Sequence, residues 1–223
     1  MQLNENTVSV LKNFANIQPN LVVNEGNLVK TIAEAKNIFG TATLDQSFPN
    51  SFGIYDLNEF LGVIGLVDNP SLVFGDKYVT ISDSTGRSSV KYHFSDPSIL
   101  TSSDRDIPMP ESEVNFELDA ATLNKILRAA STLGHEKMVI RPKDGALDIS
   151  VTDVNDATSN SFSITVPGNY SSDNFSVVMN ISNLKLLEDD YSVEISSKLL
   201  SRFTAKNKKV SYFIAMEKSS TFN

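Results

Sequence analysis

The segment Asp119-Ala-Ala-Thr-Leu-Asn-Lys-Ile-Leu-Arg128 decides the fold that the sequence predicts. Asp119 offers a side-chain oxygen that can accept a hydrogen bond from a free amide at a helix N-terminus. Apolar residues then recur at spacings of three and four, which places them on one side of an α-helix. They are Leu123, Ile126, Leu127 and Ala130. Because Lys125 and Arg128 fall on the opposite side, the segment predicts an amphipathic helix with a cationic outer face.

Three other segments start in the same way, with a capping residue and an apolar residue four positions later. They are Thr7 with Leu11 and Phe14, Asp56 with Phe60, Val63 and Ile64, and Asn180 with Leu184 and Leu187. We therefore expect four short helices. Their starts are 49, 63 and 61 residues apart, in chain order. A unit that recurs at such intervals suggests duplicated modules.

Each expected helix is followed by runs of β-branched, aliphatic and aromatic residues, joined by turns rich in Asn, Asp and Gly. Such turns between such runs indicate β-hairpins. The runs are 21–23 and 28–32, 71–74 and 78–81, 138–140 and 146–151, and 191–195 and 209–215. The predicted fold class is α+β, with short helices packed on antiparallel sheet.

A connector rich in Pro, Ser and Asp separates the second and third units. It runs from Ser95-Asp96-Pro97 to Ile107-Pro108-Met109-Pro110, and its three prolines disfavour both helix and sheet pairing. We place a domain boundary at its end. The expected domains are 1–110, which includes the connector, and 111–223.

The net charge of −8 and the pI near 4.8 argue against a protein that coats DNA with a basic surface. Cations gathered on one face would still attract DNA, because local potential matters more than total charge. Three of the four expected helices carry such cations, and their acidic residues lie only at the ends. The cations are Lys12, Lys125, Arg128 and Lys185. The second helix differs, since it has Asp56 and Glu59 and no base.

The sequence lacks the familiar catalytic, phosphate-binding and metal-binding motifs. It has no cysteine, no phosphate-binding loop and no HExxH or GxSxG motif. His93 and His135 have no second imidazole nearby in sequence, so surface positions explain them more simply than a zinc or catalytic role. The densest acidic cluster lacks the spacing of a calcium loop; it comprises Asp144, Asp148, Asp153 and Asp156. We expect no enzyme activity, no metal and no cofactor, although a hydrolase built on two carboxylates stays open as an alternative.

The N-terminal residues lack the basic and apolar regions of a signal peptide. The longest apolar stretch, 60–67, is far shorter than the roughly 20 residues of a membrane span. We therefore expect a soluble intracellular protein.

Three stretches resemble the sliding clamps of large tailed bacteriophages. They are Leu11 to Ile17, Ile54 to Gly62 and Leu123 to Arg128. The connector and the end region Tyr212-Phe213-Ile214-Ala215 fit the same family. The resemblance implies the DNA clamp fold, with two similar domains per subunit and three subunits in a closed ring. It also implies helices that line the hole, with Lys12, Lys125, Arg128 and Lys185 facing the DNA.

What the resemblance implies about partners is equally specific. An ATP-driven clamp loader places such rings on duplex DNA, the ring tethers the replicative DNA polymerase, and in these phages it also serves late transcription. A partner pocket would lie by the connector, with Ile107 and Met109 on its apolar wall. The place of action would be the cytoplasm of the infected bacterial host. A β-rich phage structural or assembly protein is the alternative reading.

Overall fold

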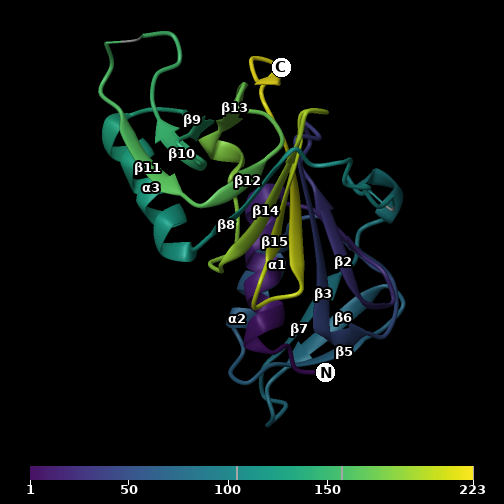
Figure 1. Cartoon of the computed structure of the whole chain (residues 1–223). Helices are drawn as coiled ribbons and strands as arrows, with labels where there is room; N and C mark the ends of the chain where they lie inside the picture. Colours follow the sequence, from purple (N-terminus) through teal and green to yellow (C-terminus); the bar gives the residue numbers. More distant parts are fainter. Residues whose placement is uncertain (104, 157, 223) are drawn as a thin grey trace. The chain divides into compact units, whose positions relative to one another are not determined.

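The structure is a computed structural model that describes residues 1–103, 105–156 and 158–222. The chain forms two compact units, Met1–Asp106 and Ile107–Asn223. Figure 1 shows helices and antiparallel meanders in both.

The first unit contains α1 (Glu5–Ile17), β1 (Leu21–Val23), β2 (Gly26–Ile32), β3 (Ile38–Phe48), β4 (Phe52–Ile54), α2 (Leu57–Gly65), β5 (Ser71–Phe74), β6 (Tyr78–Ser82), β7 (Ser89–His93) and the 3₁₀ turn η1 (Pro97–Ile99). The second contains β8 (Val114–Leu118), α3 (Ala120–Leu133), β9 (Lys137–Lys143), β10 (Ala146–Val151), β11 (Phe162–Val166), β12 (Gly168–Tyr170), β13 (Phe175–Asn180), the 3₁₀ turn η2 (Ile181–Asn183), β14 (Tyr191–Ser196), β15 (Leu200–Ala205), β16 (Val210–Ala215) and β17 (Thr221–Phe222).

In the first unit, β1 pairs with β2 and β4, and β2 pairs with β3, all antiparallel. β5, β6 and β7 form a three-stranded meander. α1 packs on β2 and β3, and α2 lies beside α1 (Figure 1). The apolar faces of both helices enter the core, where Leu11, Phe14 and Phe60 are completely buried. Burial of this apolar area is the main force that holds the helices on the strands.

In the second unit, β9 pairs with β10 and β13, and β10 pairs with β11. α3 covers one face of this sheet and contacts β10 (Figure 1). A further sheet runs β12-β8-β14-β15-β16, with antiparallel pairing throughout. Both sheets bury alternate residues of their strands, as expected for sheets with one face against a core.

The two units repeat one order of elements. In the first, a helix precedes a meander (β1–β3), a strand returns beside the first strand of that meander (β4), and a second helix precedes a second meander (β5–β7). In the second, α3, β9–β11, β13, η2 and β14–β16 follow the same order. The recurrence predicted from the sequence is therefore present in the strands.

Three of the four predicted helices are confirmed, and the first begins earlier than predicted. Its cap is Asn4, whose Oδ1 accepts a hydrogen bond of 2.7 Å from the amide of Thr7. Thr7, predicted as the cap, is instead completely buried inside the first turn. Asp56 and Asp119 cap α2 and α3 as predicted.

The prediction of a fourth helix from Asn180 is wrong. The Asn180 cap forms, but only the single turn η2 follows, closed by the amide of Leu184 on the carbonyl of Ile181 at 3.0 Å. The backbone further along this segment forms hydrogen bonds with buried side chains instead of helical ones. The Leu187 amide donates to the hydroxyl of Tyr212 (3.3 Å), and the Leu187 carbonyl accepts from the hydroxyl of Tyr191 (2.5 Å).

Asp189 holds the end of this segment in the same way. Its carboxylate accepts hydrogen bonds from the backbone amides of Asp190 (2.8 Å) and Asn207 (3.2 Å). Burial raises the pKa of the Tyr191 phenol well above its usual range, so its hydroxyl stays a donor. These bonds occupy groups that an α-helix would need for its own ladder, which is why the apolar spacing at Leu184 and Leu187 produces no helix.

The structure contains several strands that the sequence prediction missed. The longest of them is β3. Its run is interrupted by Gly40 and by polar residues near its end, which weakens the alternating pattern. Gly40 has a packing role, because a Cβ there would lie 3.1 Å from a ring carbon of Phe14 on α1. The glycine that hides the strand in the sequence thus lets α1 approach it.

The connector has little regular structure, as predicted. After η1, the described residues between 100 and 113 form no helix or strand. Leu100 is buried, and the ammonium of Lys30 lies 2.8 Å from the carboxylate of Asp106. Among the described residues, no helix is long and apolar enough to span a membrane.

Candidate nucleic-acid interface

α3 presents the clearest cationic face. The Asp119 carboxylate accepts a hydrogen bond of 2.7 Å from the amide of Thr122, and Gly134 ends the helix in the left-handed conformation at φ 70°. That amide bond, together with the Thr122 hydroxyl, lowers the pKa of Asp119 below its usual range. The cap therefore stays ionised at neutral pH, where its charge suits the helix dipole.

The two faces of α3 divide as the sequence predicts. Leu123 and Ile126 are buried, whereas Lys125 and Arg128 are exposed on the other side. Lys125 and Arg128 are three residues apart, so their charges are neighbours on the helix surface.

α1 adds Lys12, which is exposed and stands opposite the buried Leu11 and Phe14. Asn13, the next residue in the sequence, is only 8% exposed and belongs to the buried side. Lys12 is therefore a cation on an otherwise uncharged part of the exposed face.

α2 has no base, as its sequence predicts. Its Asp56 cap accepts hydrogen bonds from the amides of Asn58 (2.9 Å) and Glu59 (3.1 Å), and the Glu59 side chain is exposed. The exposed face of α2 is thus acidic at its start.

Lys185 is exposed, but it does not lie on a helix as expected. It follows η2 in irregular chain, and its amide donates to the carbonyl of Asn183 at 2.9 Å. Of the four predicted cations, three are on helices, and Lys185 is carried by the segment that replaces the fourth helix.

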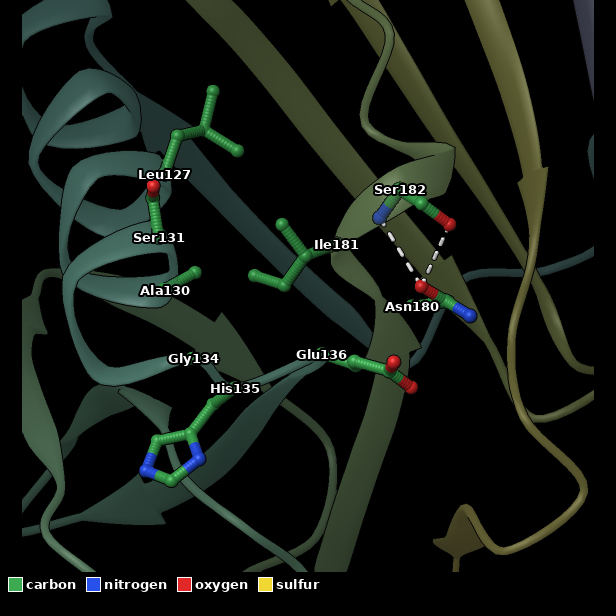
Figure 2. A pocket seen from close by; sticks show the side chains of 9 residues that line it. All are labelled: Leu127, Ala130, Ser131, Gly134, His135, Glu136, Asn180, Ile181 and Ser182. Carbon is green, nitrogen blue, oxygen red and sulfur yellow. Dashed lines mark hydrogen bonds between the residues drawn. The ribbon is translucent and has the colours of Figure 1, made fainter.

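A groove of about 460 Å³ lies between α3 and η2, where the fourth helix was expected. Figure 2 shows Leu127 and Ala130 of α3 facing Ile181 of η2 across the groove. At its rim, Asn180 accepts hydrogen bonds from the amide (3.1 Å) and hydroxyl (2.8 Å) of Ser182 (Figure 2). Because η2 makes only one turn, the apolar side of α3 is left partly uncovered here.

The predicted pocket residues Ile107 and Met109 are half-buried in the irregular chain that precedes β8. A groove of about 380 Å³ does lie beside the connector, but it is lined by an earlier part of it. Its lining includes Val22, Leu28, Lys30, Ser102 and Ser103. Ile107 and Met109 are outside this lining, so their place in a partner pocket stays a prediction.

Four of the other residues singled out in the sequence have local structural partners. His135 Nε2 lies 2.6 Å from the carbonyl oxygen of Asn160, and Asp148 lies 3.3 Å from the ammonium of Lys143. Asp153 and Asp156 accept hydrogen bonds from amides two residues further on. Across the described residues, no group of three or more His, Asp or Glu side chains could hold a metal ion.

Solved structures identify the class of this fold. Proliferating Cellular Nuclear Antigen from Entamoeba histolytica matches with a TM-score of 0.70 over 95% of both chains, at 13% identity. PCNA of A. fulgidus, solved with the C-terminal region of FEN-1 bound, matches with a TM-score of 0.71 over 96% of both chains, at 15% identity. The fold is therefore the PCNA-like clamp fold, which confirms the predicted fold class.

Sequence relatives identify the family. The "Sliding clamp" of Escherichia phage RB69 is 30% identical over 229 residues and covers 99% of each chain, and that of Vibrio phage KVP40 is 29% identical over 222 residues, 97% of this chain and 99% of the relative. The "Sliding clamp" of Enterobacteria phage T4 is 27% identical over 228 residues, 99% of each chain. The family described as "gp45 sliding clamp, C terminal" matches residues 115–218.

The chain belongs to the sliding clamp family, and its function is that of a DNA sliding clamp. Proteins of this family are processivity factors for DNA replication.

Proposed function

We propose that three copies of this chain close into a ring around duplex DNA, with residues 1–110 and 111–223 as the two domains of each subunit. Two sheet edges support this. β11 is the outer strand of its sheet, and β7 is the outer strand of the three-stranded meander. The opposite edge, at β5, already pairs with Met1, whose ammonium donates to the carbonyl of Leu72 at 2.7 Å. Two unlike edges that pair head to tail give a closed ring when the rotation between copies closes. The pairing also covers edge strands that would otherwise promote aggregation.

The contact with DNA rests on Lys12, Lys125, Arg128 and Lys185. All four are exposed in a chain with a net charge of −8. Cations on such a face contact phosphate oxygens and read no bases, because phosphates carry no sequence information. The contacts are weak and sensitive to salt, which allows the ring to slide. The acidic remainder of the surface repels phosphates and keeps the duplex in the hole.

Retention on DNA is topological and needs no chemistry by the clamp itself. A closed ring leaves the duplex only when it opens or reaches an end. We therefore propose that the chain has no catalytic activity and uses no cofactor, and that an ATP-driven clamp loader opens the ring and places it on DNA.

The ring then tethers the replicative DNA polymerase and acts in the cytoplasm of the infected bacterial host. Polymerase and loader tails insert apolar side chains beside the connector, with Ile107 and Met109 on the wall of the pocket. Both side chains are only half-buried, so they offer apolar surface to a partner. Late-transcription factors use the ring as well.

The mass in solution and the loading of charge-reversed rings test this proposal together. Light scattering should give three times the 24.4 kDa chain mass. Lys125→Glu with Lys12→Glu should reduce loader-dependent retention on DNA at least tenfold. Lys209→Glu with Lys218→Glu reverses two exposed cations outside the helices instead, so it serves as the matched control and should load like the parent. A monomeric mass, or equal loading of both variants, would contradict the proposal.

A further inference from the structure

A cavity of about 250 Å³ lies in the second unit, at the start of β8. Its apolar wall consists of Val114, Phe175 and Phe222. Its polar lining consists of Glu113, Ser171, Ser172, Asn174 and Ser197. A carboxylate beside aromatic rings suits a basic side chain, because the charged end needs an anion and the aliphatic stem needs apolar contact.

The Glu113 carboxylate is held in place by the turn that follows β14. One of its oxygens accepts a hydrogen bond of 2.7 Å from the amide of Ser197, and the other accepts one of 2.6 Å from the Ser197 hydroxyl. The Glu113 backbone is fixed as well, because its amide donates to the carbonyl of Ile195 (2.9 Å) and its carbonyl accepts from the amide of Ser171 (3.0 Å). Each carboxylate oxygen can accept a further hydrogen bond, so the group can still receive two parallel N–H donors of a guanidinium.

The charge at the cavity is negative. Partial burial acts to raise the pKa of Glu113, but the hydrogen bonds from Ser197 outweigh burial and lower this pKa overall, so the carboxylate is ionised at neutral pH. Lys198 also lowers the pKa of Glu113, but its side chain is exposed and is not part of the lining. Glu111 and Asp173 adjoin the lining in sequence, and both are exposed. These carboxylates repel a phosphate and attract a cation.

The aromatic wall is formed by packed strands. β17 pairs with β13, and the ring of Phe222 stacks on that of Phe175 with 6.1 Å between the centroids. On its other flank, Phe175 meets the ring of Tyr170 edge-on at 5.7 Å. Wall and carboxylate are therefore in position before a ligand arrives, which lowers the entropy cost of binding.

We propose that this cavity binds an arginine side chain of a partner's tail, with Glu113 as the counter-ion and Val114, Phe175 and Phe222 against the aliphatic stem. Glu113 follows Pro110, the end of the connector, by three residues. A tail that docks beside the connector can therefore place an arginine in the cavity. The choice of partner rests on the proposed function, whereas the choice of a cation rests on the cavity alone.

A small probe tests the cation site by two-dimensional NMR of the backbone amides in the assembled ring. N-acetyl-arginine amide is titrated into the parent protein, and N-acetyl-citrulline amide, which has nearly the same shape but no charge, is the matched ligand. Glu113→Gln keeps the size of the side chain and removes its charge. Glu111→Gln makes the same change outside the lining and is the matched control.

We expect the arginine probe to shift the amide signals of Ser197 and Asn174. Binding should weaken about tenfold with the citrulline probe or in Glu113→Gln, because a charged hydrogen-bond partner is lost, and should be unchanged in Glu111→Gln. Equal binding of the two probes, or unchanged binding in Glu113→Gln, would overturn the cation site and leave the clamp function standing.

Polymerase stimulation and loader-dependent loading test the assignment to a partner's tail. Glu113→Gln should reduce at least one of them severalfold at a fixed clamp concentration, while the ring mass stays that of the parent. If both activities are unchanged, the cavity does not receive a tail of either partner and the assignment is overturned. A monomeric mass of the parent protein would instead contradict the proposed ring.

Discussion

Replacing Ile126 of α3 with alanine should strongly destabilise the chain while replacing Arg128 should not. Ile126 is 0% exposed, and its removal leaves both lost apolar burial and a cavity. Such isoleucine-to-alanine changes in a core cost about 2–5 kcal/mol. For a chain of this size, about 2–4 °C of melting temperature corresponds to each kcal/mol, so the loss should be roughly 4–20 °C.

Arg128→Ala is the matched control, two residues further along the same helix and on its opposite face. The arginine is exposed, and alanine is at least as good a helix former, so the change should stay within about 0.5 kcal/mol. Urea unfolding followed by circular dichroism, at one fixed protomer concentration, compares the two variants. A loss below about 1 kcal/mol for Ile126→Ala, or an equal loss for Arg128→Ala, would refute the assignment of the two faces of α3.

Two further outcomes follow from the same structure. Asp119→Ala should cost about 1 kcal/mol at pH 7, as for other helix caps; because the folded pKa of Asp119 is lowered, this difference in urea stability should shrink as the pH falls through that pKa. Ile107→Ala and Met109→Ala should each reduce polymerase stimulation severalfold without changing the ring mass, and unchanged stimulation would remove them from the pocket.

The helix faces could be predicted because local signals decide them. A capping carboxylate and apolar residues at spacings of three and four fix α2 and α3, and the side that carries Lys125 and Arg128 follows from the same spacing. The exposure of these side chains needs no knowledge of the rest of the chain.

The fourth helix failed because its segment is shaped by distant residues. The hydroxyl of Tyr212 binds the backbone amide of Leu187 from 25 residues away, and Asn207 binds the carboxylate of Asp189 from 18 residues away. No local sequence pattern around Asn180 predicts those hydrogen bonds. β3 was missed for a similar reason, since Gly40 is explained by its close neighbours in space, Thr31 and Phe14.

The partner pocket is the least predictable part of the site. Ile107 and Met109 were chosen from their place in the connector, and the connector has no periodic pattern that would show which side chains face a groove.

The most direct measurement of the central claim is retention on DNA of defined topology. The clamp is loaded on a nicked circle by its loader and separated from free protein by gel filtration, and the circle is then cut once. A ring that encircles the duplex should co-elute with the circle and be lost after cutting, at a rate that does not depend on DNA sequence. Equal retention on circular and cut DNA would contradict encirclement and leave only ordinary surface binding.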